Sequence, residues 1–455
     1  MSQAVATQQQ KLIGRYRPYP EYKDSGVIWS GFIPSHWEPI RFKHVFVEKP
    51  KTSNIELPAG SISFGQVVFK DEEKLAEETK ASYQEVKAGE FLVNPLNLNF
   101  DLKSLRTALS EIDVVVSTGY IVLQCYRQLE ARYARWLLHE FDVAHMKSLG
   151  AGVRQTIGFN DIGNSYFCMP RLEEQLTIAA FLDHETARID RLIAQQQRLI
   201  ELLKEKRQAV ISQAVTKGLN PNAPMKDSGV EWLGQVPKHW IVRRLKHHII
   251  SMDQGWSPQC EARLAEEDEF GVMKVGCVNG GVFRFSEHKA LPAELEPKTE
   301  YRLKKGQLLV SRANTRELVG SAAVVDADYD QLLLCDKLYR IKLSSDASPE
   351  FVALLLGTSA YRGQIELSAS GASDSMQNIG QSTIKELPIA VPPMDEANDI
   401  LKYVAARLCT FDCLNNQLQQ QNLLLQERRT ALISAAVTGK IDLRGWTPPA
   451  DEVAA

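Results

Sequence analysis

Two long stretches of this chain repeat an apolar residue at every seventh position, with charged and polar residues between. The first runs from Glu173 to Gly218 and the second from Asp395 to Gly439. Sustained heptads of this kind are typical of coiled-coil helices. Each stretch predicts a helix of about 45 residues, on the order of 65 Å long. The seam positions that we assign are Leu182, Ile189, Leu203 and Val210, followed by Val404, Phe411, Leu418, Leu425 and Leu432.

The two predicted helices are suitable partners for one another. A helix with a single apolar seam must bury it against another element. An offset of 222 residues carries the first stretch onto the second, as from Leu182 to Val404. The seam of the first helix has a polar break at Gln196, and we place Leu192 and Leu199 at its second seam position. We therefore expect the helices to form an antiparallel coiled coil.

The internal duplication extends beyond the helices. The phrase Lys-Asp-Ser-Gly-Val-x-Trp-x-Gly-x-x-Pro-x-His-Trp occurs at residues 23–37 and again at 226–240. Each copy precedes a region of diverged sequence, which then leads into one of the helices. Self-similarity of this kind indicates a repeat architecture. We expect a quasi-two-fold circular arrangement in which the beginning and the end of the chain lie close together.

The diverged regions between the phrases and the helices predict two similar domains. Short β-rich runs, such as Glu111–Leu123 and Gln331–Leu343, alternate with loops rich in Gly and Asn. The fold class that we predict is α+β, with two mixed domains separated by the two long helices. The divisions are a lead-in (1–22), a first domain (23–170), a first helical spacer (171–219), a second domain (220–391), a second helical spacer (392–446) and a tail (447–455).

Composition narrows the class of protein without identifying it. The chain of 455 residues is 44% hydrophobic and 24% charged, with a net charge of −3. These values suit a soluble globular protein, and mild acidity argues against bulk attraction to nucleic acid without excluding local basic faces. We expect no transmembrane helix and no secretory signal, because no long apolar run is present. Seven cysteines without Cys-x-x-Cys spacing suit free thiols in a cytoplasmic protein.

Candidate catalytic and metal motifs are weak. No phosphate-binding glycine loop is present. The segment 94–97 lacks the second proline and the aromatic residue of an amino-methyltransferase motif, and Glu287 and Lys289 lack the partner carboxylate of a nuclease. His247 and His248 fit a surface pair better than metal ligands, and Cys409 and Cys413 fit half-buried thiols. We predict no catalytic site and no metal site, and interpret the chain as a binding protein.

The chain resembles the specificity subunits of type I restriction-modification systems over nearly its whole length. The paired phrases at 23–37 and 226–240 carry this resemblance, together with Pro-x-Leu-Glu-Glu-Gln at 170–175. The helix ends at 207–218 and 429–439, which share Ser-x-Ala-Val-Thr, carry it too. The second helix departs from the pattern, since Met-Asp-Glu-Ala at 394–397 replaces Leu-Glu-Glu-Gln.

The resemblance implies a DNA-recognition subunit with no catalytic activity of its own. Each domain would read one half of a bipartite target in double-stranded DNA, and the helices would set the spacer between the halves. The helices would also dock two methyltransferase subunits, which carry S-adenosylmethionine, and restriction subunits that translocate DNA would complete the complex. Two alternatives stay open: a regulatory or scaffold relative that binds the methyltransferase without directing it to DNA, and an enzyme whose site is not evident.

Candidate DNA-binding residues follow from the chemistry of nucleic-acid contacts. Lys and Arg bind phosphates, whereas Arg, Asn and Gln on loops read base edges. Phosphate candidates follow the repeated phrases and are Arg41, Lys43, Arg243, Arg244 and Lys246. Base-reading candidates lie in polar loops and are Arg154, Gln155, Arg312, Asn314, Arg316, Gln377 and Asn378. Gln155 and Gln377 correspond across the repeat, which favours a structural role for them because base readers should differ between domains.

Overall fold

The computed structural model describes residues 16–73, 75–96, 105–126, 128–149, 156–373 and 376–449. It divides into two compact units. Unit 1 combines the chain up to Gln197 with the chain from Gln419 onward, and unit 2 runs from Arg198 to Leu418. Each unit contains one α+β domain and one half of each long helix. Among the described residues, no helix is both long and apolar enough to span a membrane.

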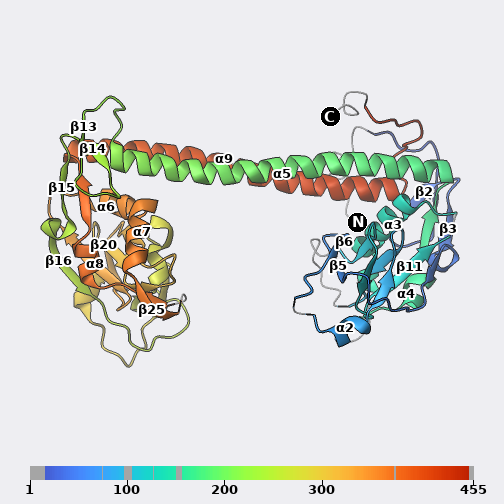
Figure 1. Ribbon diagram of the computed structural model, residues 1–455, viewed down its shortest axis with the longest axis horizontal. Coiled ribbons are helices and arrows are strands. Elements are labelled where there is room, and N and C mark those ends of the chain that lie inside the picture. The colour runs from blue at the N-terminus through green and yellow to red at the C-terminus, as the bar shows by residue number, and fades with distance from the viewer. Residues whose placement is uncertain are drawn as a thin grey trace. The chain divides into compact units, whose positions relative to one another are not determined.

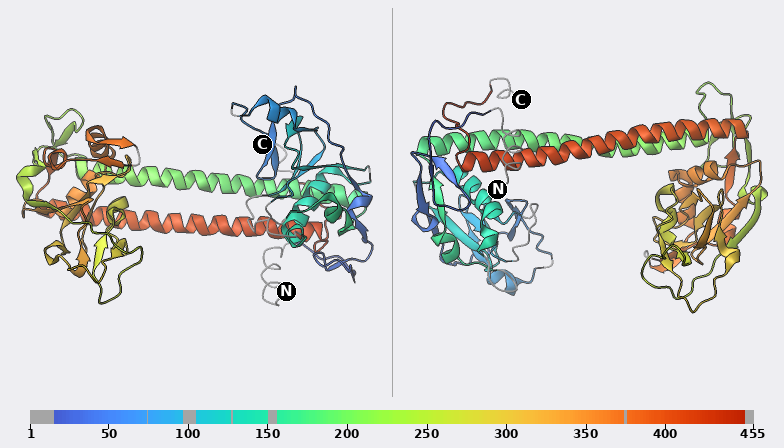
Figure 2. Two further views of the ribbon diagram at one scale, coloured as in Figure 1. Left: turned by 90° about the horizontal axis from the view of Figure 1, so that it is seen from below. Right: turned by 180° about the vertical axis from the view of Figure 1, so that it is seen from behind.

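Two long helices, α5 (Leu172–Lys217) and α9 (Met394–Val437), contain 46 and 44 residues. They lie side by side and antiparallel, as Figures 1 and 2 show in green and red. The predicted coiled-coil pair is confirmed. A glycine with positive φ follows each helix, Gly218 at 75° and Gly439 at 69°. Glycine is favoured at such positions because other residues resist a left-handed backbone.

The helix seam follows alternating spacings of four and three residues. Leu182, Ile189, Val404 and Leu432 are buried, and the other assigned seam residues, Leu203, Val210, Phe411, Leu418 and Leu425, are half-buried.

Our placement of Leu192 and Leu199 in the seam was wrong. These side chains are 38% and 45% exposed. Their neighbours Ile193 and Ile200 are more buried and follow Ile189 at the seam spacing. The sequence has an apolar residue at both adjacent positions, so the pattern alone did not distinguish the two.

Unit 1 is built on an antiparallel sheet in the order β4-β11-β8-β9. The helix α3 packs on β9, and the side chain of Glu130 caps its first turn by accepting a hydrogen bond from the backbone N–H of Tyr133. Phe42 lies at the centre of the core, with its ring 4.7 Å from those of Phe141 and Phe167. The elements are β1 (Tyr22–Asp24), β2 (Phe32–Pro34), β3 (Glu38–Arg41), η1 (Phe42–His44), β4 (Phe46–Glu48), β5 (Gly60–Ser63), β6 (Gln66–Phe69), α2 (Glu77–Ala81), β7 (Gln84–Val86), β8 (Phe91–Val93), β9 (Thr107–Leu109), β10 (Val114–Val116), β11 (Ile121–Cys125), α3 (Ala131–Ala144), η2 (Met146–Ser148), α4 (Phe159–Asn164) and β12 (Tyr166–Met169).

Unit 2 repeats this plan and adds a second sheet. The strand order β16-β24-β20-β22 corresponds to β4-β11-β8-β9, and α6 packs on β22 as α3 packs on β9. The second sheet has the order β18-β17-β23-β19. The elements are β13 (Met225–Asp227), β14 (Gln235–Pro237), β15 (Ile241–Arg244), η3 (Leu245–His248), β16 (Ile249–Gln254), β17 (Gly271–Met273), η4 (Val275–Gly281), β18 (His288–Ala290), η5 (Thr299–Tyr301), β19 (Arg302–Leu303), β20 (Leu308–Ser311), β21 (Ala313–Asn314), β22 (Ala322–Val324), β23 (Tyr329–Leu333), β24 (Leu338–Leu343), α6 (Pro349–Leu356), α7 (Ser359–Ser368), β25 (Ser370–Ser373), β26 (Met376–Asn378), α8 (Gln381–Lys385) and β27 (Pro388–Val391).

The repeated phrases form the same structure in both units. In unit 1 the phrase forms the hairpin β1–β2, and β3 then pairs with β12 just before α5. In unit 2 the phrase forms β13–β14, and β15 pairs with β27 just before α9. Each diverged domain therefore begins and ends at the same point, beside the start of a long helix.

The two ends of the described chain meet in unit 1. The backbone N–H of Asp442 donates to the carbonyl of Arg17 at 2.7 Å, and the hydroxyl of Tyr22 donates to the carbonyl of Lys440 at 3.2 Å. The expected circular arrangement is confirmed by these contacts.

Candidate nucleic-acid interface and helix junctions

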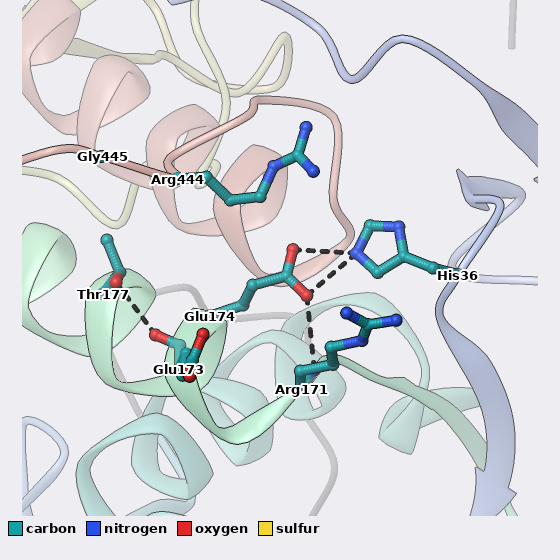
Figure 3. Close-up of a pocket in the computed structure, with 7 residues that line it drawn as sticks. All are labelled: His36, Arg171, Glu173, Glu174, Thr177, Arg444 and Gly445. Carbon is teal, nitrogen blue, oxygen red and sulfur yellow. Dashed lines mark hydrogen bonds and ion pairs between the residues drawn. The ribbon is translucent and has the colours of Figure 1, made fainter.

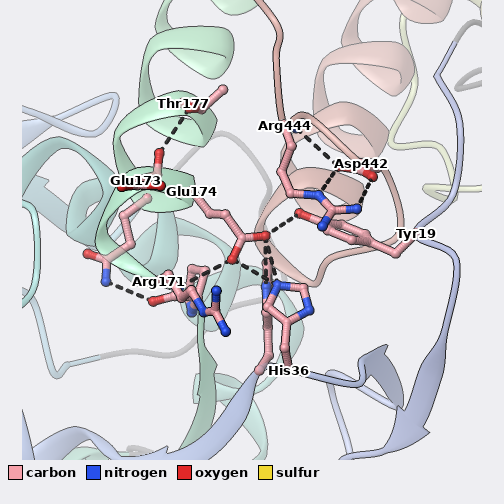
Figure 4. Close-up of polar contacts among 11 residues, drawn as sticks. Tyr19, His36, Arg171, Glu173, Glu174, Thr177, Asp442 and Arg444 are labelled. Carbon is pink, nitrogen blue, oxygen red and sulfur yellow. Dashed lines mark hydrogen bonds and ion pairs between the residues drawn. The ribbon is translucent and has the colours of Figure 1, made fainter.

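A buried carboxylate joins the first turn of α5 to the repeated phrase of unit 1. Glu174 accepts hydrogen bonds from the hydroxyl of Tyr19 at 3.0 Å and from the indole of Trp37 at 3.4 Å, and it lies 2.9 Å from Nε2 of His36 (Figure 4). Its position also places a negative charge at the positive end of the helix dipole. We call Tyr19, His36, Trp37 and Glu174 junction 1.

Unit 2 contains an equivalent junction, which we call junction 2. Glu396 accepts a hydrogen bond from the indole of Trp240 at 3.1 Å and lies 2.6 Å from Nε2 of His239. His239 and Trp240 are the final His-Trp of the second phrase, as His36 and Trp37 are of the first. The carboxylate is thus retained at Glu396, although the residues on both sides of it differ from those of the first helix.

The end of the opposite helix packs against each junction. A Cβ atom on Gly439, after α9, would lie 2.5 Å from Pro34 and 3.1 Å from Trp37. A Cβ atom on Gly218, after α5, would lie 3.2 Å from Glu396 and 3.5 Å from Trp240. Each phrase therefore holds the start of one helix and the end of the other, which explains why the phrase and the helix ends repeat together.

A hollow of about 490 Å³ opens beside junction 1 (Figure 3). Arg444, which forms an ion pair with Asp442, lines it, and the hydrogen bonds from Arg444 lower the pKa of the Asp442 carboxyl. Burial, with Glu174 close by, raises the pKa of Tyr19. The other residues that line the hollow are His36, Arg171, Glu173, Glu174, Thr177 and Gly445.

The phosphate-binding candidates of unit 1 lie near the start of the domain. The guanidinium of Arg41 lies over the ring of Tyr166, 5.0 Å from its centroid, and its Nε is buried without a hydrogen-bond partner. Lys43 is exposed and donates to the side chain of Asn164 at 3.0 Å. Arg41 ends β3 and Lys43 lies in η1, and each already makes a contact within the protein.

The corresponding candidates of unit 2 are more strongly engaged. Arg244 and Lys246 both bind the carboxylate of Glu386, Lys246 at 2.9 Å. The hydrogen bond from Lys246, followed by the charges of both cations, lowers the pKa of Glu386. Arg243 is exposed on β15. The carboxylate offsets part of the positive charge that we assigned to phosphate binding at this edge.

Four of the base-reading candidates converge on one small sheet of unit 2. Strand β21 pairs with β26, so Asn314 lies opposite Gln377 and Ala313 lies opposite Asn378. Arg312 immediately precedes β21, and its backbone carbonyl accepts from Ile379 just beyond β26. We call strands β21, β25 and β26 the polar ribbon. Sequence spacing placed these residues in two separate loops. The pairing joins the loops in one sheet, with Asn314 and Gln377 on the same face and Asn378 on the opposite one.

Contacts from the rest of unit 2 hold the polar ribbon in place. The side-chain amide of Asn314 donates to Asn279 at 3.1 Å, and the hydroxyl of Tyr339 donates to the carbonyl of Ile379 at 3.0 Å. Arg362 on α7 binds the carbonyls of Glu317 and Val319, in the loop that contains the exposed candidate Arg316. These bonds fix the backbone on both sides of the ribbon.

The remaining sequence predictions have mixed outcomes. Arg154 and Gln155 lie outside the described residues. His247 is exposed, but the expectation of a surface pair is wrong for His248, which is 2% exposed and lies 3.0 Å from Asp346. Cys409 and Cys413 are exposed rather than half-buried. Within the described ranges, no group of three or more His, Cys, Asp or Glu residues could hold a metal ion.

The two junctions were not predicted. The sequence did contain a signal for them, because His-Trp recurs at the end of each phrase and Glu recurs near the start of each helix, at Glu174 and Glu396. Repetition of two distant motifs at matching positions indicates that they contact one another.

Comparison with known proteins identifies similar chains, although no protein-family model matches. The chain is 28% identical over 241 residues to the Escherichia coli type I restriction enzyme EcoEI specificity subunit, which covers 52% of this chain and 40% of that subunit. It is 24% identical over 281 residues to the Escherichia coli K12 EcoKI specificity subunit, covering 60% and 57% of the two chains. The chain thus spans about half the length of these curated relatives.

Solved structures share the fold. A chain solved in a study of complex assembly and conformational transition of the type I R-M system matches with a TM-score of 0.66 at 15% identity, over 89% of this chain and 98% of that one. The HsdS subunit from Thermoanaerobacter tengcongensis matches with a TM-score of 0.51 at 15% identity, over 90% and 98%. In sequence and in fold, the chain is a relative of type I restriction enzyme specificity subunits.

Proposed function

We propose that this chain is the DNA-recognition subunit of a type I restriction-modification complex, in which each unit reads one half of a bipartite target. The chain performs no catalysis itself. Two methyltransferase subunits supply the adenine-modifying activity and carry S-adenosylmethionine, and restriction subunits complete the complex.

The duplicated junctions are the observation that carries this proposal. Glu174 and Glu396 anchor α5 and α9 to the two domains through the same His-Trp pair. A chain with two equivalent attachment points and two diverged domains suits a ligand with two unlike halves. Duplex DNA is such a ligand, because half-sites recur along one face at intervals of about one helical turn.

The polar ribbon supports base reading by unit 2. Arg312, Asn314, Gln377 and Asn378 offer the donor and acceptor groups that distinguish base pairs in the major groove. All four lie outside the repeated phrase and helix. Arg312 and Asn378 differ between the repeats, whereas Gln377 corresponds to Gln155. The attachment of the domains is therefore independent of the residues that would determine specificity.

Exposed leucines on the helices support the docking of two equal partners. Leu192 and Leu414 are 38% and 41% exposed, and Leu202 and Leu424 are 44% and 55% exposed. The members of each pair are equivalent in the internal repeat. Exposed apolar side chains at repeated positions suit an interaction surface that occurs twice, once for each methyltransferase subunit.

Methylation mapping tests the proposal. The chain is co-expressed with the methyltransferase subunit of its own system, and methylated adenines are mapped across the genomic DNA of the host. We expect methylation at one bipartite motif that requires both proteins. Methylation by the purified chain alone would indicate a catalytic site instead. A stable complex with the methyltransferase that methylates no motif would favour the regulatory alternative.

A further inference from the structure

An exposed aromatic residue occupies the tip of a β-hairpin in unit 1. Strands β5 and β6 pair from Gly60↔Phe69 to Ser63↔Gln66, and a two-residue turn joins them (Figure 1). The first turn residue, Phe64, is 78% exposed. It has φ of 50°, and among the described residues it is the one non-glycine residue with positive φ.

Neither packing nor turn geometry accounts for a phenylalanine here. Two-residue hairpin turns with positive φ at both central residues favour Asn-Gly or Asp-Gly. Gly65, with φ of 75°, suits the second position, but a bulky side chain at the first is strained. The ring also leaves apolar surface in water. A residue that is unfavourable in both respects suggests a function for the side chain.

The hairpin holds its tip in a fixed position. Ile62 and Val67 face one another across the strands and pack on the core of Val86, Leu92, Val114, Val116 and Val122. At the base of the hairpin, the backbone N–H of Ala59 donates to the carboxylate of Glu72. Behind the turn, Leu105 lies so close that a Cβ atom on Gly65 would be 2.8 Å from it.

The chemistry of the tip suits DNA. Ser63 and Gln66 flank the turn and offer hydrogen-bonding groups to bases or phosphates. From Gly60 to Lys70 the chain contains no acidic residue that would repel phosphates. The major groove, about 12 Å wide, admits a two-stranded β-ribbon, and a phenylalanine there contacts the methyl group of thymine.

We propose that the β5–β6 hairpin enters a groove of the target DNA and that Phe64 contacts bases of the half-site read by unit 1. This inference rests on the proposed function. It adds a residue to the recognition surface of unit 1, whose other candidates are Arg41, Lys43 and two residues outside the described ranges.

The test compares Phe64→Asn with Phe69→Asn in the complex of full chain and methyltransferase. Asn tolerates positive φ, so Phe64→Asn should fold normally, with a Tm within about 2 °C of wild type. Phe69 is the matched control, because it is 62% exposed at the other end of the same hairpin and has an ordinary strand backbone. The measurements are the methylated motif and the affinity for target DNA.

We expect Phe64→Asn to weaken target binding about tenfold or more and to relax or abolish selection in one half of the motif only. Phe69→Asn should match wild type. A Phe64→Asn complex with wild-type affinity and motif overturns the inference while the proposed function stands. Loss of the methyltransferase from the purified complex also overturns it, since Phe64 would then contact protein. If the wild-type complex methylates no bipartite motif, both proposals fail.

Discussion

The guanidinium of Arg429 on α9 binds the carboxylate of Asp190 on α5 through two hydrogen bonds, at 2.9 and 3.3 Å. Arg207 on α5 forms an ion pair with Asp412 on α9 across the other half of the seam. Both residues of the second pair are repeat equivalents of the first, with the helices exchanged. Each pair connects a residue of α5 to a residue of α9. Both pairs can form together only when the antiparallel helices are in this register.

A double-mutant cycle on Asp190 and Arg429 measures this contact. The side chains are 52% and 24% exposed, so solvent screens the pair, and we expect a coupling free energy of about 0.5–1 kcal/mol. Arg429→Ala should cost more than Asp190→Ala, because Arg429 also lies 6.0 Å from the ring of Trp136. Thermal unfolding of the two single variants and the double variant gives the coupling.

A control cycle on Arg198 and Glu201 separates register from charge. These residues form an ion pair within α5 and are 64% and 61% exposed. Their coupling should be close to zero, since an exposed pair within one helix contributes little. Equal coupling in the two cycles would contradict a role for Asp190 and Arg429 in holding the helices together.

Removal of the junction carboxylate should destabilise unit 1. Glu174 is 6% exposed, and in Glu174→Ala the buried donors of Tyr19 and Trp37 lose their acceptor. We expect a loss of about 2–4 kcal/mol, or roughly 5–10 °C in Tm. Glu173→Ala is the control, because Glu173 is exposed in the same helical turn and loses the same dipole interaction. If calorimetry gives the same Tm for both variants, the loss of stability comes from the helix dipole and not from the lost acceptor.

The contribution of Glu140 to stability should fall as pH rises between about 4.5 and 7. Burial raises the pKa of Glu140 to about 7, although Ser434 donates a hydrogen bond to it at 2.7 Å. In the unfolded chain this carboxyl ionises near its ordinary pKa of 4.5. Below that pH both states hold the proton and no penalty arises. Above it, ionisation favours the unfolded chain until the folded state also ionises near pH 7, for a total of about 3 kcal/mol.

The variant Glu140→Gln isolates this dependence. It keeps a hydrogen-bonding group beside Ser434 and cannot ionise. The free energy of unfolding of wild type minus that of Glu140→Gln should decline from pH 4.5 to 7 and be constant above. A difference that is flat across this range would show that Glu140 titrates normally.

Sequence pattern predicted the long elements well and the non-local contacts poorly. The helices α5 and α9 begin and end within two residues of the predicted limits, since heptads and repetition both constrain them. Leu192 and Ile193 are both apolar, so only packing could decide which enters the seam. His248 is buried and lies 3.0 Å from Asp346, which is 98 residues away, and no local pattern signals such a partner.

For the candidate sites too, the sequence identified residues but not the contacts between them. Residue type and loop position sufficed to select Arg312, Asn314 and Gln377, but only strand pairing placed Asn314 beside Gln377. The sequence did not indicate Phe64, because Phe-Gly is not a typical hairpin turn. The exposure of the Phe64 side chain is a property of the folded chain.

Loss of one base-reading side chain should alter one half of the target. In Arg312→Ala we expect target affinity to fall about 5- to 100-fold and specificity to relax at one or two positions of a single half-site. Lys238→Ala removes an exposed lysine of the same unit, in the repeated phrase, and should leave the motif unchanged. A motif unchanged in Arg312→Ala would remove Arg312 from the recognition surface.

The length of the helices should determine the spacer of the target. Residues 195–201 and 418–424 lie opposite each other in the register that the Asp190–Arg429 and Arg207–Asp412 pairs define. Deletion of both segments removes one heptad from each helix and leaves both ion pairs in register. At about 1.5 Å per residue the pair becomes roughly 10 Å shorter, which corresponds to about three base pairs. Methylation mapping should therefore give the same two half-sites with a spacer about three base pairs shorter.

Deletion of only one segment should break the register and prevent folding. An unchanged spacer in the double deletion, with both half-sites retained, would show that the helices do not set the distance.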